Sequence, residues 1–146
     1  LVRALSEKRP IGVRNPNAIR PWQHVLEPLC GYLNLAEKLF LDESAAWQSS
    51  FNFGPESSDC RSVKDLVEYS LRHWQGSWKD ESGHAGPFES QILSLNIDKA
   101  RDKLGWRPRW NFETSIEQTI TWYLEVMENQ RSPNVVCLEQ LKKFQT

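Results

Sequence analysis

The chain has 146 residues, of which 39% are hydrophobic and 25% are charged, and its formal net charge is -1. This composition is typical of one globular domain with a sizeable core, and it argues against a general nucleic-acid or membrane-surface binder. No apolar run approaches the roughly 20 residues that a membrane-spanning helix needs. Its three cysteines are far apart and form no CxxC pair, which disfavours a metal centre and favours a reduced, cytoplasmic setting.

The start of the chain resembles the end of a helix, with Leu1, Val2 and Leu5 apolar, and the only methionine is Met127. We therefore expect the chain to begin inside a larger protein. Within it we distinguish one lobe, residues 1–130, from a C-terminal tail, residues 131–146.

The first predicted elements flank a polar loop. A short strand over Ile11–Val13 leads into the loop Arg14–Trp22. Apolar residues then recur at helical spacing, which predicts a helix over about residues 25–41 with Pro28 in its first turn. A second short strand is expected at Phe51–Gly54.

The middle of the chain predicts one helix and one further strand. Periodic apolar residues from Val63 to Trp74 indicate a helix, with Ser62 as its N-cap. A glycine-rich stretch over residues 76–87 is expected to be a loop, and leucines alternating with polar residues predict a strand near 91–95.

The last third is expected to be helical. A short helix capped by Asn96 should end at Gly105. Either Asn111 or Thr114 caps the next helix, and the spacing Thr114 to Glu117 matches a capping box. A terminal helix is predicted over residues 135–144. The pattern is mixed α and β, with too few strands for a complete doubly wound domain, so a small α/β substrate-binding lobe is favoured.

The loop Arg14–Trp22 is the strongest candidate for binding. Arg20 offers a planar fork of N–H donors that suits a diphosphate, and two prolines stiffen its surroundings. Arg14 and Asn15 have donors and acceptors suited to a base or ribose, although Asn15 also fits the role of holding an Asn-Pro turn. A structural role for Arg20, tying the loop to a helix C-terminus, is the alternative.

Other polar candidates lie nearby in sequence or on the glycine-rich loop. His24 stands where a helix begins, so it is a candidate ligand contact, with capping or packing as the favoured alternative. Trp22 suits a core position better than a stacking platform. His84 and Glu89 are candidates to line a pocket. No GxSxG, HExxH, P-loop or GxGxxG motif occurs, and no pair of carboxylates fits a general acid and base, so the chain lacks a complete active site.

Residues 14–29, RNPNAIRPWQHVLEPL, resemble the nucleotide-sugar dehydratases of the extended short-chain dehydrogenase/reductase superfamily, and most specifically those acting on CDP-glucose. Further matches in register are NFGP at 52–55, residues 95–100, LGWRP at 104–108 and TITWY at 119–123. The last two motifs are shared across the superfamily, whereas the RPWQHV and LEP block is much more restricted. The resemblance covers about residues 1–125.

This resemblance implies a mixed α/β C-terminal substrate-binding lobe, with the NAD-binding Rossmann lobe and the catalytic residues outside this chain. The implied partner is a CDP-sugar, with no nucleic acid and no membrane, and the parent enzyme is expected to be a homo-oligomer. Arg20 matches the superfamily arginine that contacts the nucleotide near its ribose and diphosphate. Residues 13–15 match the segment beside the base, and Glu89 falls in the loop that closes over the diphosphate.

The chain departs from the expected dehydratase pattern at two positions. Phe88 replaces a histidine in the Pro-His-Glu-Ala segment, which would weaken that side of the pocket or alter its selectivity. Asn96 replaces an aspartate, with little consequence because both residues cap helices. Two alternatives stay open: another epimerase or dehydratase of the superfamily, and a non-catalytic nucleotide-sugar-binding module.

Overall fold

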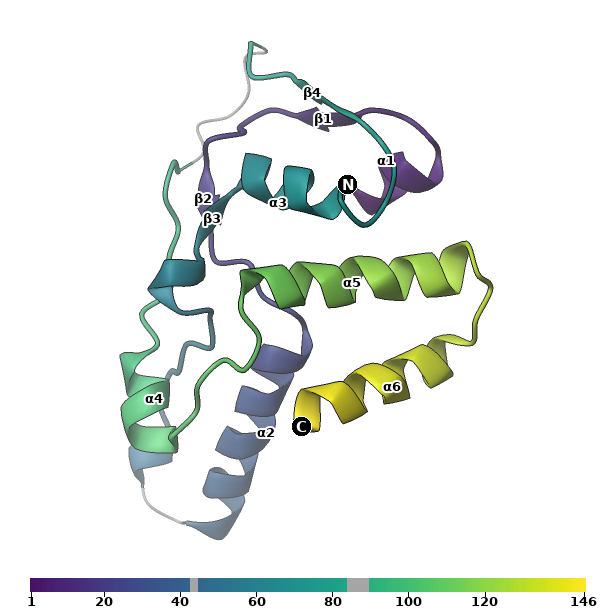
Figure 1. The fold of residues 1–146 in the computed structure, drawn as a ribbon. Helices are drawn as coiled ribbons and strands as arrows, with labels where there is room; N and C mark the ends of the chain where they lie inside the picture. Colours follow the sequence, from purple (N-terminus) through teal and green to yellow (C-terminus); the bar gives the residue numbers. More distant parts are fainter. Residues whose placement is uncertain (43–44, 84–89) are drawn as a thin grey trace.

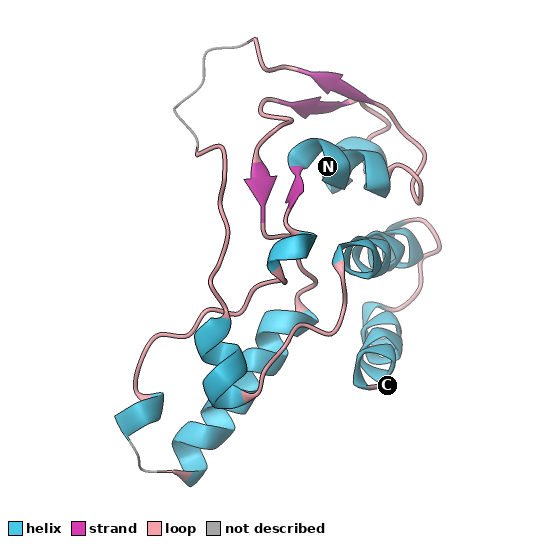
Figure 2. Cartoon of the chain, turned by 60° about the vertical axis from the view of Figure 1, so that its left-hand side comes forward, coloured by secondary structure: helices cyan, strands magenta, loops and turns pink. Residues whose placement is uncertain are grey.

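Six α-helices, two short 3-10 helices and four short strands make up the described part of the chain (Figure 1). The structure is a computed structural model, and it describes residues 1–42, 45–83 and 90–146. The mixed α and β character expected from the sequence is confirmed within these ranges. Figure 2 shows that the strands gather at one end of the molecule, while the long helices occupy the rest.

The strands form two separate two-stranded sheets. In the first, β1 (Ile11–Val13) pairs in parallel with β4 (Trp78–Asp80), with Ile11 opposite Trp78. In the second, β2 (Ile19–Arg20) pairs antiparallel with β3 (Arg61–Ser62). The polar loop between β1 and β2 is therefore fixed at both ends. Its two flanking strands pair with β4 and β3, which lie far away in the sequence.

The main hydrophobic core lies between the first sheet and three helices: α1 (Val2–Ser6), α3 (Val63–Ser70) and α5 (Phe112–Met127). Apolar residues of α5 recur three or four positions apart, so one face of this helix is buried. The buried members of this core are Leu5, Ile11, Val13, Val67, Trp74, Phe112, Ile116 and Ile120.

A second, smaller core lies between α2 (Leu26–Leu41) and α4 (Asp98–Leu104). Its buried side chains are Phe53, Ile97, Ala100 and Trp106. The ring of Phe53 meets that of Trp106 edge-on, with centroids 5.0 Å apart. The 3-10 helices η1 (Ala45–Trp47) and η2 (Ser57–Asp59) lie in the connections on either side of Phe53.

The C-terminal residues fold back along α5 as α6 (Pro133–Gln145), as Figure 1 shows. The predicted terminal helix is thus confirmed. Arg131 joins the two helices because its guanidinium contacts Glu125 at 3.1 Å and Glu139 at 2.7 Å. Val136, Gln140 and Phe144 are the buried residues of α6.

Several local sequence signals are confirmed. The Ser62 hydroxyl accepts the N–H of Asp65 at 3.0 Å, and Asp65 in turn accepts the N–H of Ser62, which completes a capping box at the start of α3. Gly105 ends α4 with φ at 64°, a left-handed conformation that favours glycine. Pro28 lies in the first turn of α2, where its missing N–H costs no helical hydrogen bond.

Some predicted elements are wrong. Residues 51–54 form no strand, because Phe53 is anchored by its buried ring and by a bond from the Gln23 amide to its carbonyl at 2.9 Å. The segment 91–95 makes only an isolated bridge, between Ile92 and Ile19. The capping box predicted from Thr114 is also wrong, since the Asn111 side chain caps α5 by accepting the N–H of Thr114.

Other elements were missed or misplaced by the sequence analysis. Strands β2, β3 and β4 were expected to be loop, because strands of two or three residues carry too little alternation to be recognised. The helix expected over 63–74 ends at Ser70, and a turn then brings Trp74 into the core.

Candidate functional site

The loop between β1 and β2 is fastened to the start of α3 by backbone hydrogen bonds. The N–H of Val63 donates to the carbonyl of Ala18 at 3.0 Å, and the N–H of Lys64 donates to that of Pro16 at 2.9 Å. Ala18 has no exposed surface. The loop is therefore held by a helix and a strand, which is how proteins commonly present binding residues.

Two of the predicted site residues lie at the start of this loop. Arg14 follows β1 directly and is exposed, whereas Asn15 is half-buried. The carbonyl of Asn15 accepts the N–H of Ala18 at 3.3 Å, so Asn15 belongs to the turn that was considered as its alternative role. This bond uses the backbone of Asn15, which leaves its side-chain amide for other contacts.

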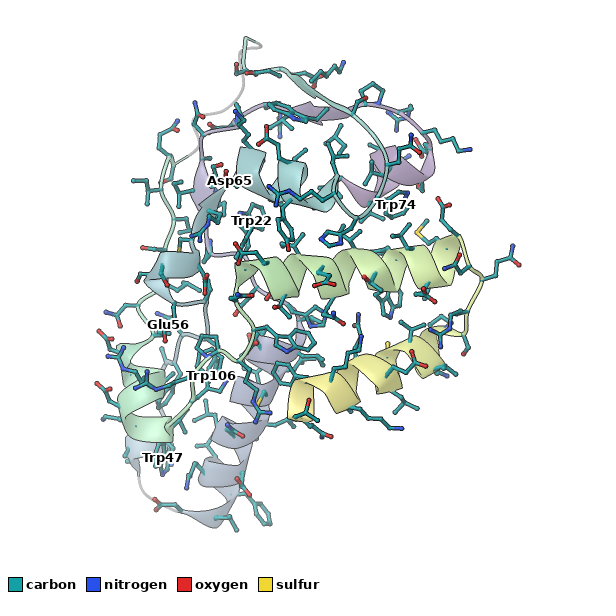
Figure 3. All side chains as sticks on the ribbon, viewed as in Figure 1. Trp22, Trp47, Glu56, Asp65, Trp74 and Trp106 are labelled. Carbon is teal, nitrogen blue, oxygen red and sulfur yellow. The ribbon has the colours of Figure 1, made fainter. Side chains whose placement is uncertain are left out.

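Arg20 lies at the end of β2, half-buried, and its Nη1 donates to the carbonyl of Ile19 at 2.8 Å. Its partner in the antiparallel register is Arg61 of β3. Trp22 reinforces this pairing, because its indole N–H donates to the carbonyl of Arg61 at 3.0 Å. Figure 3 shows Trp22 close to the N-terminal end of α5. Two guanidinium-bearing residues thus stand opposite each other on neighbouring strands.

His24 turns inward and is only 5% exposed. Its Nδ1 accepts the N–H of Leu26 at 3.3 Å, and its ring meets that of Trp110 with centroids 4.9 Å apart. Burial lowers the pKa of His24 to about 4, and a side-chain hydrogen bond with Gln140 opposes this shift. The imidazole is therefore neutral near pH 7, so it can donate and accept hydrogen bonds but offers no positive charge to a phosphate.

Glu27, a residue that the sequence analysis did not single out, ties α2 to the segment before α5. It has no exposed surface, and its carboxylate accepts the N–H of Arg109 at 3.1 Å and that of Trp110 at 2.7 Å. Burial raises the pKa of Glu27, although the two backbone donors and the Arg109 charge act to lower it. Its place in the LEP block of the resemblance was a sequence signal, although nothing there indicated that the carboxylate would be buried.

A cavity of about 520 Å³ lies where the start of α2 faces α5 and α6. Most of its surface is apolar, and the buried Oε1 of Gln23 has no hydrogen-bond partner within the described residues. Of the predicted site residues that the structure describes, only His24 lines this cavity. Its lining consists of Gln23, His24, Val25, Leu26, Thr119, Trp122, Tyr123, Cys137 and Gln140.

The structure thus places Arg14, Asn15 and Arg20 on one anchored segment and turns His24 into the interior. The fifth predicted residue, Glu89, lies outside the described residues, as do His84 and Phe88. The pairing of Arg61 with Arg20 was not foreseen, because it depends on the register of two short strands. Within the described ranges, no cluster of three or more potential ligands could hold a metal ion. None of the helices described here has the length and apolar character to cross a membrane.

Comparison with known proteins relates this chain to the nucleotide-sugar 4,6-dehydratases. It is 36% identical over 125 residues to the CDP-glucose 4,6-dehydratase of Salmonella typhimurium strain LT2. A shorter match, 40% identical over 38 residues, is to the dTDP-glucose 4,6-dehydratase of Xanthomonas campestris pv. campestris. These similarities confirm the resemblance expected from the sequence.

The two matches differ in extent. The match to the Salmonella protein covers 84% of this chain and 34% of that relative, whereas the Xanthomonas match covers 26% and 11%. The chain therefore spans about a third of the length of the Salmonella relative. No family model matches the chain.

Proposed function

We propose that this chain is the nucleotide-sugar-binding part of a CDP-glucose 4,6-dehydratase, corresponding to the smaller C-terminal lobe of an extended short-chain dehydrogenase/reductase. The observation that carries this proposal is the similarity over 84% of the chain to a protein of that name. The mixed α/β fold and the anchored, arginine-bearing loop support it. The reaction proposed for the whole enzyme is conversion of CDP-glucose to CDP-4-keto-6-deoxyglucose.

The binding roles follow from position and chemistry. Arg20 would contact the diphosphate through its guanidinium, and the exposed Arg14 and the amide of Asn15 would contact the base or ribose. His24, being buried and neutral, would contribute by shaping the wall beside Gln23 rather than by charge. Glu89 is proposed from the resemblance alone.

The NAD that this class of enzyme implies does not fit the present chain. The sequence contains no GxGxxG motif, and the strands of the described residues form two small sheets rather than one parallel sheet. We therefore assign the cofactor and the redox chemistry to a part of the enzyme outside this chain. On this proposal the fragment alone is inactive as a dehydratase.

A related nucleotide-sugar dehydratase is the second candidate, favoured by the match to the dTDP-glucose enzyme. The two candidates differ in the base that the lobe selects. Asn15 offers both a donor and an acceptor, which suits discrimination between base edges, but its position alone favours no particular base.

Calorimetric titration of the chain with CDP, UDP and dTDP tests the proposal. We expect tighter binding of CDP, and we expect Arg20→Ala to weaken it by about tenfold or more, because a charge-assisted contact to phosphate is lost. Arg72→Ala is the matched control, since Arg72 is exposed and lies over the Tyr69 ring beyond the end of α3. Equal binding of all three nucleotides would support the second candidate, and no binding by folded protein would contradict both.

A further inference from the structure

Helix α2 presents apolar residues on two faces, and the rest of the chain covers one of them. The inner face packs on the second core, where Gly31 lies against the Phe53 ring. The outer face carries apolar residues three or four positions apart, beginning at the N-cap, which lie within about 100° of the helix circumference. We call these residues the outer stripe of α2: Val25, Leu29, Tyr32, Leu33, Ala36 and Phe40.

The outer stripe is exposed along its whole length. Each of its six residues is exposed, and Phe40, at 88%, has the highest exposed fraction among the large apolar side chains that the structure describes. A helix that is apolar on two opposite faces is normally buried on both, and a contiguous exposed apolar patch marks an interaction surface. We therefore expect a partner to cover the outer stripe.

A cavity lies at the opposite end of the outer stripe from Phe40. Val25 belongs to the stripe and also lines the cavity of about 520 Å³ described above, together with the rings of Trp122 and Tyr123. None of the described residues that line this cavity carries a full charge near pH 7, since His24 is neutral there. Cavities with apolar walls and few polar groups accept apolar and aromatic groups. Figure 1 shows the start of α2 beside α5 and α6, and its other end well away from both.

The outer stripe is symmetric in sequence about a point between residues 32 and 33. Its two ends, Val25 and Phe40, are about 22 Å apart along the helix. If two α2 helices pack antiparallel around a two-fold axis at that point, Phe40 of each copy meets the cavity of the other, and Leu29 lies opposite Ala36. At each of these positions a large side chain meets either a cavity or a small side chain, which is the complementarity that close packing needs.

We infer that the outer stripe of α2 is the interface of a homodimer, in which a second copy of this chain docks antiparallel and places its Phe40 in the cavity beside Val25. The geometry selects a copy as the partner because one face carries both the projecting ring and, at its other end, the cavity that receives it. Charge does not oppose this pairing, since Glu37 faces Pro28 of the second copy rather than another acid. The inference goes beyond the proposed function and is independent of the nucleotide that this lobe binds.

Sedimentation velocity of the chain at increasing concentration tests the inference. One helix face and one cavity per copy make a small interface, so we expect a dissociation constant of about 1–100 µM and mostly dimer at about 500 µM. Phe40→Ala should weaken association by about tenfold or more, because it removes the ring that fills the cavity. Its circular dichroism spectrum should be unchanged, since the side chain is exposed within one chain. Ile92→Ala is the matched control: Ile92 is also exposed and apolar but lies beside β2, and we expect no change in association.

A charge swap at Leu33 separates a two-fold dimer from non-specific adhesion. Leu33 is exposed and lies beside the inferred axis, so its two copies approach each other in the dimer. Leu33→Asp and Leu33→Lys each bring like charges together, and each variant alone should be monomeric. An equimolar mixture of the two variants should recover the dimer, because opposite charges then meet across the axis.

Three results would overturn the inference. A folded chain that stays monomeric at about 500 µM would mean that another partner covers the outer stripe, such as the part of the enzyme outside this chain. Undiminished dimers of Leu33→Asp alone would place the interface elsewhere. Association that Phe40→Ala leaves unchanged would show that the cavity receives no ring from a second copy. Binding of CDP is measured separately, so none of these results bears on the proposed function.

Discussion

The carboxylate of Glu27 accepts the backbone N–H of Trp110 at 2.7 Å across 83 residues of sequence. The same side chain accepts the N–H of Arg109 at 3.1 Å from each of its oxygens. One buried acid therefore fixes the first turn of α2, which follows the arginine-bearing loop, relative to the segment that enters α5.

Replacing Glu27 by alanine should destabilise the fold strongly. The substitution leaves two backbone N–H groups buried without an acceptor, so we expect the free energy of unfolding to fall by about 2–4 kcal/mol. Urea denaturation followed by circular dichroism measures this change. The matched control is Glu37→Ala on the exposed side of α2, for which we expect a change within about 0.5 kcal/mol. Similar effects of the two substitutions would contradict the role given to Glu27.

Acid should destabilise the protein through His24. Its pKa in the folded state is lowered from 6.5 to about 4, so between these values the unfolded chain binds a proton that the native chain does not. The contribution of His24 is present above pH 6.5 and is lost as the pH falls towards 4, with a total of about 3 kcal/mol. Glu27 acts with the opposite sign, because its raised pKa stabilises the native state at low pH and this contribution is lost as the pH rises.

Comparison of the unaltered protein with His24→Gln isolates the contribution of His24 to the pH dependence of stability, because both proteins contain Glu27. We expect the difference in unfolding free energy between the native protein and the variant to shrink by about 3 kcal/mol from about pH 7 to about pH 4. Urea titrations across this range measure it. A pH-independent difference would show that His24 titrates normally in the folded protein.

Gly31 allows α2 to approach the second core closely. A Cβ atom at this position would overlap the Phe53 ring, which is only 6% exposed and packed against Trp106. Gly31→Ala should therefore lower stability by about 1–3 kcal/mol, despite the better helix propensity of alanine. Thermal unfolding tests this expectation. Gly83→Ala is the control, since among the described residues no atom beyond its chain neighbours lies within 4 Å of the added Cβ there, and an equal effect at both positions would rule out the steric explanation.

The left-handed backbone at Gly105 gives a fourth prediction. With φ at 64° and no other part of the described chain within 4 Å of an added Cβ, the cost of a side chain there is conformational rather than steric. We expect Gly105→Ala to destabilise the protein by about 1 kcal/mol and Gly105→Asn to cost less, because asparagine tolerates this conformation better. Denaturant midpoints of the two variants provide the comparison. Equal losses of stability in the two variants would contradict the assignment of the cost to the left-handed φ of residue 105.

Local sequence signals determined several elements of the fold. The apolar periodicity of residues 25–41 predicted α2, Ser62 marked the start of α3, and Gly105 marked the end of α4. Each of these signals acts within a few residues, through side-chain spacing, a capping bond or a backbone preference. The block at residues 14–29 also carried the resemblance that the comparisons confirm.

The tertiary structure alone decided which distant segments meet. The two-residue strands β2 and β3 exist because each supplies the other's hydrogen bonds, so neither can be recognised from its own residues. The same pairing sets Arg61 opposite Arg20, and folding of residues 109–110 against α2 leaves Glu27 buried with backbone donors. Such relations depend on long-range packing and register, which override local propensity and which local patterns do not encode.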